Sequence, residues 1–332
     1  MMKQKRINLI TGALPLLLLY CSLLCSCVAE DLSDCPRQKL RVTLSFEAET
    51  QGAPTRAGGE THAVTLYAYG DNGQCQLAHD FLIENLNSTT TLEVDLEPGT
   101  YDFVAWVNHK NKDFEYEHFK LSHYDRYPQV RPTKDVSRLD LNIPVSSIID
   151  IDNRPLPLLL HGSVSGRQLQ GGDEEVKIPL VQNTNYIYFT VEGLERTTDV
   201  YEFKVRDYNG AYTFENEFAA CSPFSYVKTA RFSGNTLKTE KMTVLRLAKG
   251  RTPEFSLRDR DTEKTLYPAS SSHETNLIKL IENAYKDNGK TIDFDKQHVF
   301  DIKIKFNGDV NMDVTITVNG WKINEDDIGL RP

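Results

Sequence analysis

Two cysteines near the N-terminus, Cys25 and Cys27, are the residues of this sequence best placed for covalent chemistry. A cysteine directly after the cleavage site of a signal peptide can be acylated on its thiol by the lipoprotein-processing machinery. Leu24 at position −3 and Ser26 at position −1 favour Cys27 as the acceptor. Cys25 is the alternative, because Leu24 at its −1 position is bulky for a cleavage site. We therefore predict a lipid on Cys27.

The segment before Cys27 has the order of a secretory signal: three basic residues before position 7, an apolar run over 9–24, then small residues. A plain secretory signal and a membrane-spanning helix are the competing interpretations. A span needs about 20 apolar residues, whereas this run is shorter and contains a threonine, a glycine and a proline. We expect residues 1–26 to be removed and residues 27–38 to form a lipidated acidic tether. Several acyl chains on one residue suffice for stable membrane attachment, at about 0.8 kcal/mol per buried methylene.

The remaining bulk composition describes an acidic, strand-rich body. Removal of the signal leaves 306 of the 332 residues, a length that suits two domains. The removed segment carries three basic and no acidic residues, so the formal charge changes from −9 to −12. This charge argues against binding to nucleic acid and against electrostatic attraction to anionic lipid. The abundance of aromatic residues, 15 Tyr and 15 Phe, favours strands.

Three cysteines follow the lipid site: Cys35, Cys75 and Cys221. In an oxidising envelope they allow one disulfide and one free thiol, or no disulfide at all. If a disulfide forms, we expect Cys35 to pair with Cys75, since both fall in the first half of the chain. No Cys-x-x-Cys or Cys/His metal spacing is present in the sequence.

No group of residues elsewhere forms a convincing active site. The densest titratable group is Glu115, Glu117, His118 and His123, which a solvated loop explains better than a metal site. There is no G-x-S-x-G elbow and no glycine-rich phosphate loop. Acidic residues are so common that some carboxylate pair will be close by chance, so nothing specific in the sequence supports a glycosidase. Two tryptophans remain as possible sugar platforms. Trp106 lies in an apolar run and is expected in the core, while Trp321 is open to either interpretation. We expect no catalysis, cofactor, metal or small-molecule substrate.

Short alternating segments separated by turns predict an all-β body. The clearest expected strands are 39–47, 63–69, 91–96, 101–108, 138–145, 186–191, 201–205, 242–247, 301–306 and 312–318. One segment, 274–287, has helical periodicity, with Ser272 or Thr275 as a candidate N-cap and Gly289 as a candidate stop. The polar, proline-rich stretch after Asp150 suggests a boundary there. We expect two tandem antiparallel β-sandwiches, 39–150 and 151–332, with one short helix in the second.

Several short stretches together resemble the FimB/Mfa-type fimbrial anchor lipoproteins, which are related to fimbrillins. The resemblance is spread over nearly the whole mature chain, in the order of the family. It lies in Cys27 with 30–36 (EDLSDCP), 96–101 (LEPGTY), 104–108 (VAWVN), 156–163 (LPLLLHGS), 181–185 (VQNTN) and 316–321 (ITVNGW).

This resemblance implies transthyretin-like β-sandwiches and a place at the base of a cell-surface fimbrium. In that family the lipid holds the protein in the outer membrane, and the body fastens the shaft and limits its growth and release. The implied partner is a fimbrial shaft subunit, reached through a strand edge. The acidic residues after Cys27 fit export to the outer surface. Related shaft subunits polymerise by strand exchange after an arginine-specific protease removes their first strand.

Arg56, in the sequence PTRAG, lies where such a cut would fall, just after the first expected strand. An ordinary loop arginine is the simpler interpretation. A cut there would separate Cys27 from the body, so we expect strand 39–47 to stay in place and fill its own groove. A polymerising or tip subunit cut after Arg56 is the alternative within the same superfamily. A surface glycan-binding lipoprotein is the alternative from another class.

Overall fold

The computed structural model describes residues 39–45, 61–84, 90–108, 118–122, 127–171, 174–269, 271, 273–307 and 313–319. The chain divides into two units, Met1–Gln38 and Lys39–Pro332, and all described residues belong to the second. Within these residues the protein is mostly β, as the sequence predicts, with a single α-helix. No described helix is both long and apolar enough to cross a membrane.

The elements of the first half are short strands with one turn of 3₁₀ helix, Lys134–Val136. The strands are β1 Lys39–Ser45, β2 Thr61–Gly70, β3 Cys75–Glu84, β4 Thr90–Asp95, β5 Gly99–Val107, β6 Phe119–Leu121, β7 Arg138–Leu141, β8 Ile148–Asp150, β9 Leu160–Leu169 and β10 Glu175–Gln182.

The second half contains the remaining strands and the helix α2, Leu277–Asp287. The strands are β11 Thr184–Glu192, β12 Tyr201–Asp207, β13 Ala211–Thr213, β14 Phe224–Ala230, β15 Phe232–Ser233, β16 Thr236–Lys238, β17 Met242–Leu245, β18 Glu254–Asp259, β19 Thr265–Tyr267, β20 Val299–Asn307 and β21 Asp313–Val318.

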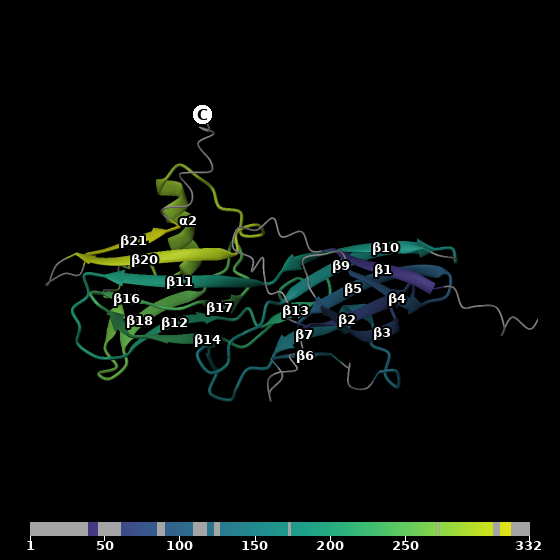
Figure 1. Cartoon of the computed structure of the whole chain (residues 1–332), viewed down its shortest axis with the longest axis horizontal. Helices are drawn as coiled ribbons and strands as arrows, with labels where there is room; N and C mark the ends of the chain where they lie inside the picture. The colour runs from purple at the N-terminus through teal and green to yellow at the C-terminus, as the bar shows by residue number, and fades with distance from the viewer. Residues whose placement is uncertain are drawn as a thin grey trace, which may run out of the picture. The chain divides into compact units, whose positions relative to one another are not determined.

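Seven strands in the order β3-β2-β5-β9-β10-β1-β4 form the first sheet (Figure 1). Alternate side chains from its strands meet in one apolar cluster, so the sheet encloses a core between its own two ends. Fully buried members of this cluster include Val42, Val64, Phe103 and Ile178. The alternation that predicted these strands therefore corresponds to burial of one face.

Strands β9 and β10 approach each other closely at one glycine. The first part of β10 pairs with β1 up to Pro179, and its last three residues pair with β9. A Cβ on Gly162 would lie 2.6 Å from the carbonyl oxygen of Pro179, closer than side chains approach backbone in proteins. Proline lacks an N–H and glycine lacks a side chain, so the two permit a close strand crossing.

The outer face of β2 and β5 is covered by a second cluster. Trp106 is fully buried and contacts the His161 ring edge-on at 4.6 Å between centroids, which confirms its expected place in the core. Phe214 meets Tyr67 and Tyr69 at ring distances of 4.8 and 5.9 Å. The small sheet β13-β7-β6 contributes Leu139, Leu141 and Phe119 to the same cluster.

The second half places two sheets around stacked aromatic rings. One contains β15-β16-β11-β20-β21 with β17 also paired to β11, and the other contains β19-β18-β12-β14-β8. Phe189 of the first sheet stacks on Phe203 and Phe255 of the second, at 5.1 and 4.7 Å. Among the described strands, the pairs β1–β10, β11–β20 and β14–β8 are parallel, so the expectation of antiparallel sandwiches is wrong for these pairs.

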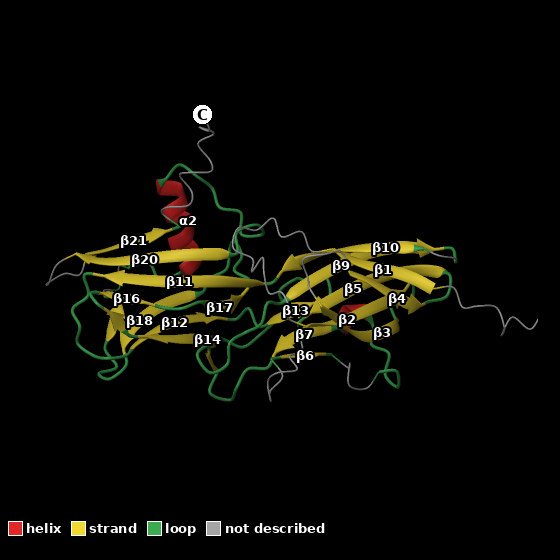
Figure 2. Cartoon of the chain, in the orientation of Figure 1, coloured by secondary structure: helices red, strands yellow, loops and turns green. Residues whose placement is uncertain are grey.

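Helix α2 begins at Leu277, later than the expected 274–287, and packs near β21 (Figure 2). Its N-cap is Asn276, whose side chain accepts from the N–H groups of Ile278 and Lys279, rather than Ser272 or Thr275. Asparagine ranks with serine as an N-cap, and the two expected caps lie four residues and one residue before the observed one. Gly289 follows the helix with φ +71°, as expected for a C-terminal stop.

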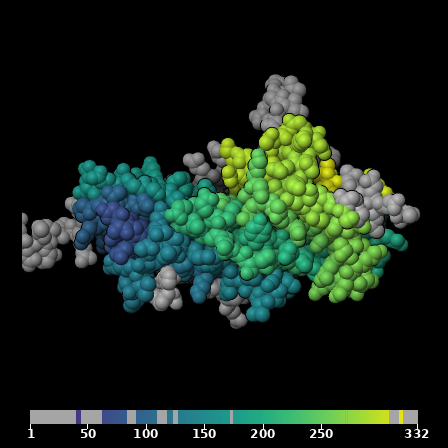
Figure 3. Space-filling view, turned by 180° about the vertical axis from the view of Figure 1, so that it is seen from behind, coloured from purple at the N-terminus to yellow at the C-terminus, as the bar shows by residue number. Residues whose placement is uncertain are grey.

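The sheets do not divide at residue 150. β9 and β10 belong to the first sheet, whereas β8, which precedes the expected boundary, pairs with β14 of the second half. The space-filling view from behind shows teal residues beside the purple and blue ones as well as beside the green (Figure 3). Local alternation identifies a strand but carries no information on its pairing partner, so the proline-rich stretch was a poor guide to sheet membership.

Replacement of Gly162 tests the close crossing of β9 and β10. We expect Gly162→Ala to lower the free energy of unfolding by about 1–3 kcal/mol, because the added methyl group forces the two backbones apart. Urea denaturation followed by tryptophan fluorescence measures the change. Gly70→Ala is the matched control, since its Cβ would lie 3.4 Å from flexible side chains and should change stability by less than about 0.5 kcal/mol. Equal effects of the two substitutions would contradict this explanation.

Candidate functional site

The first strand, β1, lies inside the sheet rather than at an edge. It pairs in parallel with β10, with Arg41–Ser45 opposite Glu175–Pro179. On its other side it pairs antiparallel with β4, with Lys39–Leu44 opposite Asp95–Thr90. The two neighbouring strands and the core beneath them form a groove that β1 occupies. We call this arrangement the β1 groove.

The inner side of β1 fills the floor of the groove. Leu40 lies opposite Val94, and Val42 lies opposite both Leu92 and Val176. Val42 is fully buried and Leu40 is 4 % exposed, so both contribute apolar burial, worth about 1.5–3 kcal/mol for each side chain. An extended segment needs small or medium apolar residues at alternate positions to fit here.

The outer side of β1 is matched by polar partners. Arg41 lies directly opposite Glu93 of β4 and Glu175 of β10. The Thr43 hydroxyl donates to a carboxylate oxygen of Glu175 at 2.7 Å and lies 3.3 Å from the hydroxyl of Thr91. Opposite charges directly across a sheet favour one register. The groove therefore selects a strand with apolar residues on its inner face and a positive charge on its outer face.

The start of β1 is attached to the β9–β10 hairpin. The backbone N–H of Arg41 donates to the carbonyl oxygen of Glu174 at 2.9 Å. The Glu174 carboxylate accepts from the N–H groups of Gln170 and Gly171, at 2.6 and 3.0 Å, which fixes the turn. The N-terminal end of the groove is therefore held by backbone as well as side-chain bonds.

Several residues singled out by the sequence lie outside the described residues: Cys25, Cys27, Cys35, Arg56, Glu115, Glu117, His123 and Trp321. The lipid site, the Arg56 cut and the Cys35–Cys75 disulfide stay predictions. Cys75 itself is buried, and its Sγ donates to the carbonyl oxygen of Leu77 at 3.1 Å. Burial raises the pKa of this thiol to about 12, so it is not a reactive thiolate at neutral pH.

His118, expected in a solvated loop, is instead fully buried beside Phe119. Burial, with a smaller contribution from the positive charge of Arg154, lowers its pKa to about 4, so the ring is neutral at pH 7. No group of three or more His, Cys, Asp and Glu residues in the described part of the chain is arranged to hold a metal ion. The neighbouring hydrophobic strand β6 could have signalled this burial.

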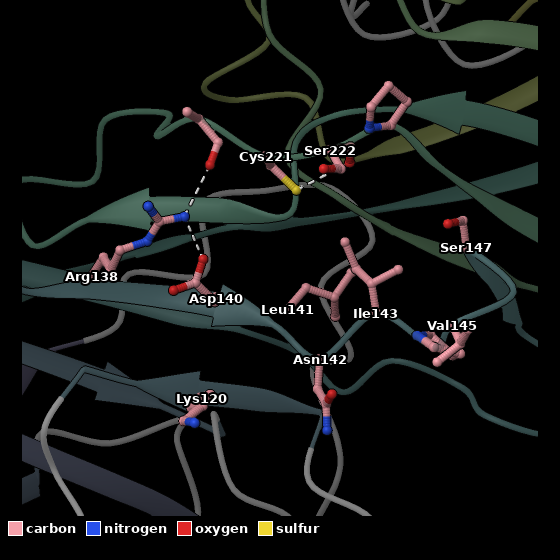
Figure 4. A pocket seen from close by; sticks show the side chains of 13 residues that line it. Lys120, Arg138, Asp140, Leu141, Asn142, Ile143, Val145, Ser147, Cys221 and Ser222 are labelled. Atoms are coloured by element: carbon pink, nitrogen blue, oxygen red, sulfur yellow. Dashed lines mark hydrogen bonds and ion pairs between the residues drawn. The ribbon is translucent and has the colours of Figure 1, made fainter.

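An open pocket of about 540 Å³ lies beside β7 and the loop before β14 (Figure 4). The Arg138 guanidinium in it bonds to Asp140 and to the carbonyl oxygen of Ala220. The Cys221 Sγ donates to the Ser222 carbonyl oxygen at 3.3 Å, and burial raises the pKa of this thiol. In this pocket Arg138 and Asp140 already bind each other, and the Cys221 thiol is protonated. These residues therefore offer no nucleophile with an adjacent base.

Three of the short stretches noted in the sequence meet around one position of the fold. Trp106 of β5 and Val181 of β10 both lie opposite His161 of β9. The His161 Nε2 is 2.9 Å from the carbonyl oxygen of Phe214, and Asn183 donates its N–H to the Leu159 carbonyl oxygen at 2.8 Å. Sequence reasoning did not single out His161 or Asn183, although both lie in the quoted stretches.

Comparison with known proteins agrees with this architecture. The profile of the fimbrillin-A associated anchor proteins Mfa1 and Mfa2 matches residues 32–327. The chain belongs to this family. Membership makes it a fimbrial anchor protein and not an enzyme. The minor fimbrium anchoring subunit Mfa2 of Porphyromonas gingivalis is 22% identical over 332 residues, covering 96% of each chain.

Solved structures with the same fold include other members of this anchor group and its neighbours. The fimbrial anchor protein Mfa2 of Porphyromonas gingivalis has a TM-score of 0.59 at 20% identity, covering 85% of this chain and 98% of that one. A candidate polysaccharide-binding protein of Bacteroides thetaiotaomicron has a TM-score of 0.64 at 20% identity, covering 85% and 96%. At such identities the likeness concerns the fold alone.

Truncation of Leu40 tests the contribution of the inner side of β1 to the anchor protein. We expect Leu40→Ala to lower the free energy of unfolding by about 2–5 kcal/mol, as for other buried leucines. Amide hydrogen exchange should also accelerate in β4 and β10. Lys177 of β10 supplies the control, since its side chain is exposed and Lys177→Ala should change stability by less than about 0.5 kcal/mol. A negligible effect of Leu40→Ala would show that β1 is not docked in solution.

Acidification tests the buried histidine at the meeting point of β5, β9 and β10. Burial lowers the pKa of His161 from 6.5 to about 4, so the unfolded state takes up a proton first. Its contribution to stability is complete above pH 6.5 and decreases by up to about 1.4 kcal/mol per pH unit towards pH 4. Urea denaturation at pH 7, 6 and 5 should show a shallower pH dependence for His161→Gln. Identical slopes in the two proteins would contradict the assignment.

Proposed function

We propose that this anchor protein is an outer-membrane lipoprotein, acylated on Cys27, that holds the base of a cell-surface fimbrium. In this proposal residues 1–26 are the signal peptide, and the acidic segment 27–38 connects the lipid to the body. The body binds a fimbrial shaft subunit through strand or edge contacts on the outer surface. It thereby limits the length of the fimbrium and its release.

The observation that carries this proposal is the interior position of β1. The tether is continuous with a strand that already fills the groove between β4 and β10. A chain that keeps its own strand in this groove cannot accept a strand of another subunit there. The protein would therefore end a polymer rather than extend it. As the family resemblance implies, we also propose that its sandwiches are transthyretin-like.

Two alternatives make different use of the same fold. A polymerising or tip subunit would be cut after Arg56 and lose β1. A glycan-binding lipoprotein is suggested by the description of the similar Bacteroides thetaiotaomicron structure. The described residues favour it less, since Trp106 is fully buried and offers no exposed platform for a sugar ring.

Removal of the acyl acceptor tests the proposal in cells. We expect Cys27→Ser to abolish labelling by an alkyne fatty acid and to shift most fimbriae from the cells into the medium, because the shaft loses its membrane attachment. Labelling, fractionation and electron microscopy measure both effects. Deletion of the gene should release fimbriae that are abnormally long. Cys221→Ser is the control and should keep both the label and the attachment.

Three outcomes separate the alternatives. Loss of the label in Cys25→Ser but not in Cys27→Ser would move the lipid site to Cys25. N-terminal analysis of the mature surface protein should begin at Cys27, whereas a predominant start at Ala57 would place the protein among shaft or tip subunits. Binding to a polysaccharide with normal fimbriae in the deletion strain would favour the glycan-binding alternative.

A further inference from the structure

The strand that follows the tether is positioned to bear mechanical load. This inference rests on the proposed function, in which a fimbrium pulls on the body while the lipid holds the N-terminus. Load from the membrane side then enters at Lys39, the first residue of β1. The way in which β1 is bonded to its neighbours decides how much tension the attachment withstands.

The parallel arrangement of β1 and β10 places their bonds in shear. Arg41 lies opposite Glu175 at the N-terminal end of the pair, and Ser45 lies opposite Pro179 at the other end. Tension that enters at Lys39 pulls β1 towards its N-terminal end, and tension that leaves through the C-terminal end of β10 pulls β10 the opposite way. The backbone hydrogen bonds between β1 and β10 are then loaded all at once. If both strands were instead pulled apart from the same end, these bonds would break one after another.

Side chains oppose sliding of β1 as well. A shift by one residue would turn Leu40 and Val42, which are buried, towards the outer side of the sheet. It would also separate the Thr43 hydroxyl from the Glu175 carboxylate, now 2.7 Å apart. The first increment of sliding therefore breaks apolar, polar and backbone contacts at once.

The load leaves β10 without an intervening loop. Asn183 alone separates β10 from β11, and β11 lies inside a sheet between β16 and β17 on one side and β20 on the other. Asn183 and Asn216 exchange side-chain amide hydrogen bonds, one of them at 3.1 Å. The carbonyl oxygen of Asn183 accepts from the N–H of Arg246 at 2.9 Å. Asn183 is fully buried and held by these hydrogen bonds. The connection can therefore transmit tension into the second half without becoming longer.

We propose that the β1–β10 pair is a shear clamp, which holds the body of the protein on its membrane tether under tension. The clamp is strong only for a pull along β1. Its strength comes from the parallel register of the pair and from the direct continuation of β10 into β11.

Single-molecule force spectroscopy with two pulling directions tests this. The mature chain is held by a coupling tag in place of the lipid at residue 27 and by an azide introduced as Val181→azidophenylalanine or as Gln170→azidophenylalanine. Val181, 50 % exposed, lies at the C-terminal end of β10, whereas exposed Gln170 lies in the hairpin at the start of β10. We expect β1 to detach at a force at least twofold higher through position 181 than through position 170.

Two variants make the outcome specific to β1. Leu40→Ala should lower the detachment force through position 181, and Lys177→Ala, at an exposed position of β10, should leave it nearly unchanged. Equal forces in the two directions, or an equal response to the two variants, would overturn the clamp. Chemical denaturation of both azide variants confirms that they are folded. The measurement uses isolated protein, so a failed clamp leaves the fimbrial role standing, and loss of that role leaves the measured forces unchanged.

Discussion

The pairing of β1 with β10 on one side and β4 on the other is the interaction on which the rest of the molecule depends. Without β1, Leu92 and Val176 would lose the side chains that lie opposite them in the core of the first sheet. Each of the neighbouring strands would also expose a row of unpaired backbone groups, which invites association with another chain. Retention of this strand therefore stabilises the body and covers the backbone groups of β4 and β10 at the same time.

The structure shows what three of the short stretches that resemble the anchor family do physically. Trp106, His161 and Val181 come from three strands and lie at one level of the sheet, next to the buried Asn183. Asn183 bonds to backbone and side chains from three other segments of the chain. A buried amide that is fully hydrogen-bonded fixes one arrangement of the segments around it. These residues build the connection between the two halves and bear no chemistry of their own.

The sequence identified many of the strands and the single helix, but it missed other strands, including β3, β10, β14 and β18, and it carried no information on which strands pair. Alternation over 39–47 identified β1 because one of its faces is buried. Nothing local revealed that β1 pairs in parallel with β10, more than 130 residues later, or that β9 joins the first sheet. The burial of His118 was missed for a related reason, since a single polar residue next to the charged residues Glu115 and Glu117 gives no periodic signal of its own. Pairing over long separations is set by the whole core rather than by any one segment.

Covalent connection explains why β1 should keep its groove. Only 15 residues, 46–60, separate β1 from β2, so the strand remains at a high effective concentration beside its own groove. A competing strand in solution has no such advantage and would need more favourable contacts than Leu40, Val42 and Thr43 make. Cleavage in that segment would remove the covalent advantage but none of the contacts, so the detached strand would leave only at the rate at which those contacts break. The groove therefore favours its own strand as long as the connection to β2 is intact, which suits a chain that ends a polymer.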